Sequence, residues 1–308
     1  MSRRIHTFTA NLLWETTYRA GSWMPGDTVR AESESVQVGG KGINVSRMLN
    51  RLGAANTAIL FPAGTVGALC TEWLENHGLS TRTFEADGET RTGFVVRSQG
   101  MPETTFLGED RPPNEVALRD CCDYLLEIPE GDALAVCGSI PGWAAPAFDP
   151  LRETLDRLIR KLFVAVDTCG PPLSWFAERP VGLVKINERE FQGIRPGDHT
   201  TLREIHRHRV SPRAWVVTDG KRNVKIIGPE NEYFEKNPPP VQEVSPTGSG
   251  DVFLAAFLHA RLNEGKSMVE AADEAIPLAA ANCTSHGIAD YPDELAGALK
   301  EEYRRLNN

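Results

Sequence analysis

The residues best suited to chemistry form a short turn, Gly248-Ser249-Gly250-Asp251. Prolines precede it at 238–240 and good helix formers follow from Val252 to Leu262, so the glycines should open a helix. The first N–H groups of a helix are unpaired and partly positive, which favours an anion such as phosphate. A carboxylate there would repel the anion, so Asp251 suggests a base for an attacking hydroxyl. A simple turn with an acidic residue in the first helical turn would have the same sequence, and both interpretations stay open at this point.

A second glycine-rich stretch, Gly39-Gly40-Lys41-Gly42, lies about two hundred residues earlier. Apolar residues at 45, 48, 49 and 52 then have helical spacing, which predicts a helix from Ile43 to Leu52, ended by Gly53. Lys41 is the only charged residue of the loop. It could hold an anion, or it could be a solvated lysine in an ordinary turn.

The two stretches together resemble the signatures of the ribokinase-like (PfkB) sugar kinases. The turn at 248–251 is similar to the family's Gly-Ala-Gly-Asp, and residues 39–46 are similar to its Gly-Gly-Lys-Gly-x-Asn-Val-Ala. The resemblance runs from near residue 5 to near residue 290. It looks closest to the branch that phosphorylates sugar phosphates, such as 1-phosphofructokinase and tagatose-6-phosphate kinase. It implies an ATP-dependent kinase that uses Mg²⁺, with Asp251 as the catalytic base and Gly248, Ser249 and Gly250 as the anion hole.

The resemblance also implies an acceptor site. Glu15 stands where the family has an Asp that holds sugar hydroxyls. Arg91, in a stretch similar to Glu-Thr-Arg-Thr-Asn, would grip a phosphate on the acceptor together with Lys41, because a guanidinium suits bidentate phosphate contacts. The Asn that usually ends this stretch is Gly93 here. The residues expected at the acceptor are Glu15, Gly39, Gly40, Lys41, Asn44, Arg91 and Ser139.

Further stretches resemble the nucleotide side of the family's site. Lys185-Ile-Asn187-Glu-Arg-Glu190 is similar to Lys-Pro-Asn-x-x-Glu, whose Asn and Glu organise Mg²⁺ through water. Asn-x-x-Glu is also a common helix start, and without the resemblance we would favour that capping role. The residues expected at ATP are Lys185, Asn187, Thr218, Gly220, Gly248, Gly250 and Asn282, and those expected at the metal are Asn187 and Glu190.

The remaining pattern predicts the elements that position these residues. From residue 54 onward, short apolar runs alternate with helical segments, which favours an α/β fold with a mainly parallel central sheet flanked by helices. The polar residues that follow each run should meet at the carboxyl edge of the sheet. Alternating segments at about 9–38 and 90–110 predict a small β-sheet that acts as a lid. We therefore expect one ribokinase-like kinase domain over residues 1–308.

Composition excludes several classes. The net charge of −9 argues against a nucleic-acid surface. No apolar stretch reaches the roughly 18 residues of a membrane span, and no signal peptide is recognisable. The six cysteines lack paired zinc spacing, which favours free thiols in the cytoplasm. The expected partners are a small-molecule sugar or sugar phosphate and, through the lid, a second copy of the chain.

Two alternatives remain open from the sequence. The chain could phosphorylate an unphosphorylated sugar or a nucleoside, or it could be a sugar-phosphate or nucleotide sensor without fast chemistry. Ile186 stands where the family has the Pro of Lys-Pro-Asn, and this departure, with those at Glu15 and Gly93, favours the sensor, whereas the intact aspartate of the glycine turn favours the kinase. A dinucleotide-binding dehydrogenase is disfavoured, because its glycine-rich turn should directly follow the first strand of a βαβ unit.

Overall fold

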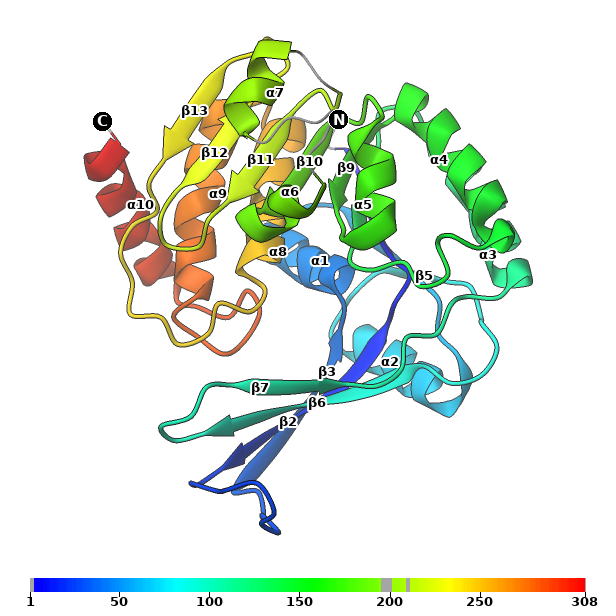
Figure 1. Ribbon diagram of the computed structural model, residues 1–308, viewed down its shortest axis with the longest axis vertical. Helices are drawn as coiled ribbons and strands as arrows, with labels where there is room; N and C mark the ends of the chain where they lie inside the picture. The colour runs from blue at the N-terminus through cyan, green and yellow to red at the C-terminus, as the bar shows by residue number, and fades with distance from the viewer. Residues whose placement is uncertain (1–2, 195–200, 209–210, 308) are drawn as a thin grey trace.

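The computed structural model describes residues 3–194, 201–208 and 211–307 and contains a nine-stranded sheet between two layers of helices (Figure 1). The strand order is β13-β12-β11-β10-β9-β8-β1-β4-β5. All neighbours pair in parallel except β11 with β12 and β12 with β13. The strands are β1 (Ile5–Thr9), β4 (Asn56–Leu60), β5 (Thr81–Thr83), β8 (Ala133–Cys137), β9 (Phe163–Asp167), β10 (Leu183–Asn187), β11 (Trp215–Thr218), β12 (Val224–Ile227) and β13 (Tyr233–Lys236). The mainly parallel sheet predicted from the sequence is confirmed.

The two helical layers follow from the alternation of side chains along the strands. In β8, Ala133, Ala135 and Cys137 face one layer, and Leu134 and Val136 face the other. The first layer contains α1 (Lys41–Arg51), α2 (Gly64–Asn76), α8 (Ser249–Leu258), α9 (Met268–Asn282) and α10 (Asp293–Asn307). The second contains α3 (Glu115–Glu127), α4 (Asp149–Lys161), α5 (Gly170–Ala177), α6 (Glu188–Ile194) and α7 (Leu202–His208). No helix in the described ranges is both long and apolar enough to cross a membrane.

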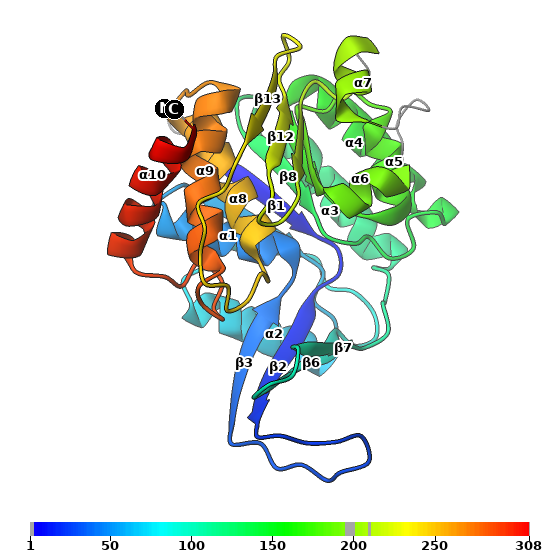
Figure 2. The same ribbon diagram turned by 60° about the vertical axis from the view of Figure 1, so that its left-hand side comes forward.

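A second, four-stranded sheet projects from the carboxyl edge of the large sheet (Figures 1 and 2). Its strand order is β3-β2-β6-β7, with β2 parallel to β6 and antiparallel to β3. The strands are β2 (Leu13–Ala20), β3 (Ser33–Gly39), β6 (Arg91–Ser98) and β7 (Thr104–Leu107). This small sheet is the one that the alternating segments predicted.

The carboxyl edge of the large sheet collects the polar residues that follow its strands. Topology concentrates them, because β1 lies between β4 and β8, so that the chain adds β4 and β5 on one side of β1 and the strands from β8 onward on the other, and ligands of parallel sheets bind at such a switch point. The residues at or just after these strand ends are Asn11, Ser139, Asp167, Asn187 and Thr218.

Two helices of the first layer begin at this edge. Helix α1 starts at Lys41 and not at Ile43 as predicted, so Lys41 belongs to the first helical turn. The glycines before it end β3, and Gly40, with a φ of 136°, turns the chain into the helix. Helix α8 is buried from Asp251 to Leu258 between α1, α9 and the sheet. Its burial fixes the position of the turn that precedes it.

Candidate active site

The glycine turn opens α8 with one residue, Gly248, in a conformation that other residues rarely adopt. Gly248 has a φ of 76°, and a Cβ there would collide with the Ile288 side chain. A Cβ on Gly250 would collide with the ammonium of Lys185. The N–H groups of Ser249 and Asp251 are bonded within the turn, at 3.2 and 3.0 Å. Those of Gly248 and Gly250 have no backbone partner in the described part of the chain, so they are the donors available to an anion.

Asn282 supports this turn from behind. It is completely buried, and its amide nitrogen donates to the carbonyl of Thr247 at 3.0 Å and to Ser249 Oγ at 3.3 Å. Its amide oxygen accepts from the N–H of Ala289 at 2.8 Å. The Ser249 hydroxyl also contacts Cys283 Sγ at 3.0 Å and therefore points toward α9. Asn282 holds the turn in shape, and its predicted contact with a nucleotide stays a prediction.

Asp251 is a buried carboxylate that accepts a hydrogen bond from one side chain. It is 5 % exposed, and Asn44 Nδ2 of α1 donates to its Oδ2 at 2.7 Å. Burial raises its pKa to about 6, with a further contribution from the negative charge of Asp167. A carboxylate with a pKa near 6 is ionised at neutral pH and still a better proton acceptor than an ordinary aspartate, which suits a general base.

Asp167 forms a second buried carboxylate between two lysines. Lys41 Nζ donates to its Oδ1 at 2.6 Å, and Lys185 Nζ donates to its Oδ2 at 2.7 Å. Although burial alone would raise the pKa of Asp167, the charges of Lys185 and Lys41 outweigh it and hold the pKa below its usual value. Asp167 is not among the residues predicted for the site, although its place at the end of a buried strand is a signal for it.

The ammonium of Lys185 also lies against Gly250 at the start of α8. A cation at the positive end of a helix dipole is unfavourable unless an anion lies nearby. Asp167 and Asp251 supply part of that negative charge, and a phosphate at the glycine turn would supply more. The electrostatics of the turn therefore favour an anionic ligand.

Lys41 interacts with the same buried charges, and we call the cluster of Asp167, Asp251, Lys185 and Lys41 the buried centre. Besides its bond to Asp167, its ammonium lies 3.7 Å from Glu190 Oε1. Burial opposes its charge, but Asp167, Asp251 and Glu190 more than compensate, and the pKa of Lys41 lies above its ordinary value. Arg91 instead contacts Asp110 and the carbonyl of Asn11. The sharing of one acceptor phosphate by Lys41 and Arg91 stays a prediction.

Asn187 and Glu190 form a reciprocal cap at the start of α6. The N–H of Asn187 donates to Glu190 Oε2, and the N–H of Glu190 donates to Asn187 Oδ1, both at 2.9 Å. The capping role is therefore present, and Glu190 Oε1 is left on the side of Lys41. Among the described residues no group of three or more His, Cys, Asp or Glu side chains could enclose a metal. The oxygen of Glu190 that the cap does not use fits Mg²⁺ bound mainly through water and phosphate.

Thr218 and Gly220 follow β11 beside this cap. The Thr218 hydroxyl donates a long hydrogen bond of 3.4 Å to the carbonyl of Ile186, and Gly220, with a φ of 54°, is exposed in the following turn. Both lie at the same edge as Asn187, since β10 and β11 pair in parallel. Their predicted contact with a nucleotide stays a prediction.

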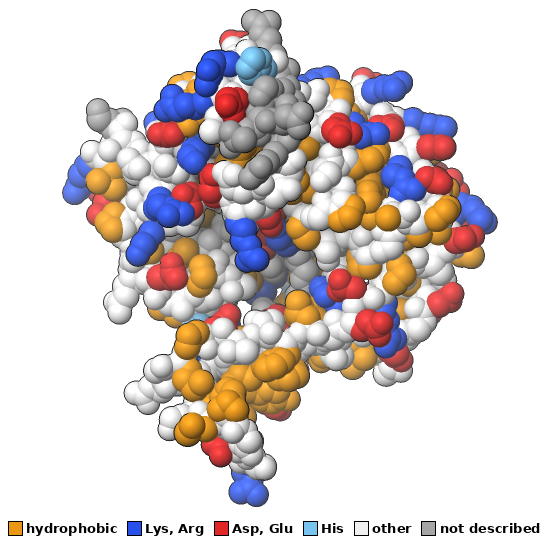
Figure 3. All heavy atoms as spheres, viewed as in Figure 1, with side chains coloured by type: hydrophobic (Ala, Val, Ile, Leu, Met, Phe, Trp, Pro, Cys, Tyr) orange, Lys and Arg blue, Asp and Glu red, His pale blue; other side chains and the backbone are white. Residues whose placement is uncertain are grey.

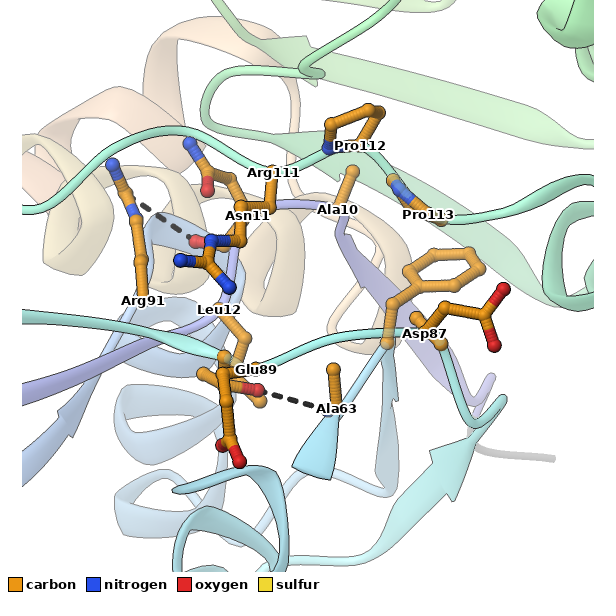
Figure 4. A pocket seen from close by; sticks show the side chains of 13 residues that line it. Ala10, Asn11, Leu12, Ala63, Asp87, Glu89, Arg91, Arg111, Pro112 and Pro113 are labelled. Carbon is orange, nitrogen blue, oxygen red and sulfur yellow. Dashed lines mark hydrogen bonds between the residues drawn. The ribbon is translucent and has the colours of Figure 1, made fainter. Parts of the chain in front are cut away.

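The predicted acceptor residues lie between β1, β8 and the small sheet. Arg91 Nη1 donates to Asp110 Oδ1 at 2.6 Å, and Arg91 Nη2 makes a 3.4 Å bond to the carbonyl of Asn11. Asn11 Nδ2 donates to the same oxygen of Asp110 and to Ser139 Oγ, both at 2.8 Å. Figure 4 shows Arg91 and Asn11 in the pocket that lies here, lined also by Arg111 and Glu89. Asn11, Asp110 and Arg111 were not among the predicted site residues.

The small sheet explains two departures from the family pattern. Glu15 Oε1 accepts from Gln37 Nε2 at 2.5 Å, and Gln37 in turn accepts from Arg47 at 3.2 Å, so the longer carboxylate is held across neighbouring strands. A Cβ at Gly93 would lie 2.9 Å from the carbonyl oxygen of Phe106. Position 93 therefore has no room for the family's Asn. Whether Glu15 contacts a sugar stays a prediction.

Comparisons with known proteins agree with this site. Residues 9–294 match the family model described as pfkB family carbohydrate kinase. The chain is 24 % identical over 265 residues to 1-phosphofructokinase of Borreliella burgdorferi, covering 83 % of each chain. It is 26 % identical over 279 residues to ATP-dependent 6-phosphofructokinase isozyme 2 of Escherichia coli, covering 87 % of this chain and 88 % of that one.

Solved structures show the same fold. The structure of phosphofructokinase-2 from Escherichia coli in complex with fructose-6-phosphate superposes with a TM-score of 0.86 at 23 % identity, covering 99 % of this chain and 100 % of that one. The family match spans both glycine-rich stretches and every strand-end residue of the site. The chain belongs to the pfkB family of carbohydrate kinases and is an ATP-dependent sugar kinase.

Proposed function

We propose that the chain transfers a phosphoryl group from ATP to a hydroxyl of a sugar phosphate, with Asp251 as the general base. One observation supports this most strongly. Asp251 is a buried, ionisable carboxylate with a pKa of about 6, and it lies in the same helical turn as the free N–H groups of Gly248 and Gly250. A binding protein would gain an anion site from the glycines alone and would have no use for the carboxylate.

The geometry divides the chemistry among few residues. Asn44 holds one oxygen of Asp251 and leaves the other to accept the proton of the acceptor hydroxyl. As the hydroxyl oxygen bonds to the γ-phosphorus, its proton passes to Asp251 and ADP leaves with the bridging oxygen. The N–H groups of Gly248 and Gly250, with Lys185 beside them, stabilise the negative charge on the transferring group.

ATP and Mg²⁺ fit the remaining residues of the edge. We assign the nucleotide to the side of Asn187, Thr218 and Gly220, where β10 and β11 end. Bound Mg²⁺ would neutralise charge on the phosphates, and Glu190 would orient one of its waters through the oxygen not used in the cap. We infer that Lys41, whose ammonium lies between Asp167 and Glu190, contacts the transferring group.

A phosphorylated acceptor explains the other half of the site. Arg91 lies at a pocket outside the buried centre, where a guanidinium can bind a phosphate with two hydrogen bonds. Several relatives carry names of enzymes that act on fructose phosphates. We infer that Arg91 and Ser139 bind the phosphate end of the acceptor, while Glu15 and Asn44 lie toward its sugar.

We propose that residues 1–308 form one kinase domain whose small sheet acts as a lid. The lid already reaches the glycine turn, because Thr247 Oγ1 lies 3.4 Å from Glu103 Oε1, which belongs to the β6–β7 hairpin. A lid over the site would exclude water, which otherwise competes as a phosphoryl acceptor.

The outer face of the lid favours a homodimer. Val36, Phe94 and Phe106 are 38, 41 and 49 % exposed, and Phe94 stacks on Phe106 and contacts the ring of Tyr18 (Figure 3). A contiguous aromatic patch on a sheet is typical of an interaction surface. Sedimentation velocity should show a dimer that Phe94→Glu dissociates, and a wild-type monomer at micromolar concentration would contradict this proposal.

We also propose that the chain works in the cytoplasm. All six cysteines are free thiols, which fits a reducing compartment. Fractionation of the native host, with detection by antibody, should place the protein with soluble cytoplasmic enzymes.

The kinase proposal is tested by ADP release from ATP and Mg²⁺ across a panel of acceptors. The panel contains fructose-1-phosphate, fructose-6-phosphate, tagatose-6-phosphate, the free sugars and ribonucleosides. Turnover on sugar phosphates alone is expected. Turnover only on free sugars or nucleosides would keep the kinase and remove the acceptor phosphate, and ATP binding without any turnover would favour a sensor.

A further inference from the structure

The connector between the lid and α3 brings a carboxylate to Arg91 and a second arginine to the pocket that Arg91 lines. This connector, residues 108–114, leaves β7 and crosses the acceptor pocket before α3 begins. Asp110 and Arg111 follow one another in it, and both are exposed. Asp110 pairs with Arg91, while Arg111 lines the same pocket.

Asp110 makes the contacts that an anionic ligand would make. Arg91 Nη1 and Asn11 Nδ2 both donate to its Oδ1, at 2.6 and 2.8 Å. The same Asn11 amide also reaches Ser139 Oγ at 2.8 Å. A single oxygen therefore receives an arginine and an amide from two different elements, which is a typical oxyanion environment.

The pocket contains more donors than its own carboxylates satisfy. Arg111 has no hydrogen bond or ion pair in the described part of the chain, and Figure 4 shows its side chain with those of Arg91 and Asn11. Arg91 Nε is buried without a hydrogen-bond partner. Glu89 caps the start of α2 through the N–H groups of residues 65 and 66, and Asp87, the other carboxylate of the pocket lining, makes no hydrogen bond or ion pair with Arg91 or Arg111 among the residues described. The pocket therefore has donor capacity for another anion.

We propose that Asp110 occupies the place of the acceptor's phosphate when the site is empty, and that Arg111 joins Arg91 in binding the phosphate that displaces it. This inference rests on the proposed sugar-phosphate acceptor. The ligand class is a phosphomonoester dianion. Asp110 is thus an internal competitor, and Arg111 is a specificity-determining residue.

The exchange is electrostatically favourable. The Arg91 side chain is 12 % exposed but that of Asp110 is 55 % exposed, so water can solvate the carboxylate when it leaves Arg91, and the incoming phosphate replaces its charge. A phosphate ester carries more charge than a carboxylate and has three acceptor oxygens, enough for both guanidiniums and Asn11. An unphosphorylated sugar cannot replace the carboxylate. Asp110 therefore keeps Arg91 occupied against acceptors that lack the phosphate.

Two variants test the exchange against a purely structural role for Asp110. Asp110→Asn should lower the KM for the best sugar phosphate, and the inhibition constant of inorganic phosphate, about three- to tenfold, because the competing charge is removed. Arg111→Gln should raise both about tenfold, the usual effect of losing one hydrogen bond to a charged group. The KM for the unphosphorylated sugar should change in neither variant.

Matched controls come from α4, which is part of neither site. Asp156→Asn removes a half-exposed aspartate that pairs with Arg179 at 2.8 Å, and Arg160→Gln removes an exposed arginine. Both should leave the KM and the phosphate inhibition constant at the wild-type values. If Asp110 merely held Arg91 in place, Asp110→Asn would raise the KM, and that result would overturn the proposal, as would an unchanged KM in Arg111→Gln.

The same measurements distinguish an error in the exchange from an error in the proposed acceptor. If the wild type uses sugar phosphates but Asp110→Asn binds them more weakly, only the exchange is wrong. If the wild type uses no sugar phosphate, the proposed acceptor is wrong. Calorimetric titration of inorganic phosphate then decides the exchange alone: tighter binding by Asp110→Asn supports it, and equal or weaker binding overturns it.

Discussion

The buried centre and the acceptor pocket both hold charged side chains for a ligand, but the charges are mostly buried in the first and partly exposed in the second. In the centre, Asp167 is 1 % exposed and fixed between two lysines, and Asp251 is held by Asn44. At the pocket, the carboxylate of Asp110 is 55 % exposed and belongs to a connector. The centre is rigid before any substrate arrives, whereas the pocket has to exchange an internal partner for the ligand.

This difference assigns different kinetic roles to the two regions. Preorganised charges in a dry site stabilise a transition state, because they need no rearrangement during the reaction. Exposed, exchangeable charges discriminate between ligands instead. We therefore expect variants of the centre to change kcat and variants of the pocket to change the KM for a phosphorylated acceptor.

The largest effect should come from Asp251. Asp251→Asn keeps the shape and the hydrogen bond to Asn44 but removes the proton acceptor, so kcat should fall about 10²- to 10⁴-fold. ATP binding, measured by calorimetry, should stay within about twofold of the wild type. A kcat near the wild-type value would place the base elsewhere.

The next largest effect concerns stability. Asp167→Asn removes the carboxylate that pairs with the ammonium of Lys185, whose side chain is 5 % exposed, and breaking a buried ion pair costs about 3–5 kcal/mol. Urea unfolding should show this loss, whereas Asp110→Asn should change the free energy of unfolding by less than about 1 kcal/mol. Equal losses of unfolding free energy in both variants would contradict the difference in rigidity between the buried centre and the acceptor pocket.

A variant of Lys41 tests whether this residue acts with the buried centre or with the acceptor pocket. The sequence placed it with Arg91, but its ammonium bonds to Asp167 in the centre. Lys41→Gln should therefore lower kcat for phosphorylated and unphosphorylated acceptors alike, by roughly 10- to 100-fold for one lost charged contact. A change in the KM of the sugar phosphate alone would show that Lys41 binds the acceptor phosphate together with Arg91.

The pH profile gives the smallest and most specific effect. Because burial raises the pKa of Asp251 to about 6, the base is protonated and inactive below that pH, so kcat/KM should fall tenfold per pH unit under pH 6 and level off above it. Asn44→Ala removes a hydrogen bond that lowers this pKa, so the acidic limb should move to higher pH. A limb that does not move in Asn44→Ala would show that another group titrates.

The sequence predicted the parts of this account that depend on local pattern. The glycine turns, the strand-end positions of Asn187 and Thr218, and the small sheet follow from residue types and periodicity. The contacts that cross the fold could not be predicted, because Asp110 meets Arg91 and Asn11 only through the path of the connector. The supporting role of Asn282 under the glycine turn could not be predicted, since burial is a property of the packed helix and not of the sequence motif, and its contact with a nucleotide stays a prediction. The start of α1 at Lys41 was not predicted, because Gly42 is a poor helix former and suggested a loop at this point.

The most direct test compares Asp251→Asn and Arg91→Gln on one acceptor with and without its phosphate, measuring kcat/KM for each. The account predicts that Asp251→Asn lowers both values by the same factor, because the base acts on the hydroxyl in either case. Arg91→Gln should lower only the value for the phosphorylated acceptor, by about tenfold or more. Equal losses on both acceptors in Arg91→Gln would contradict the division of the site into a buried centre and a phosphate-reading pocket.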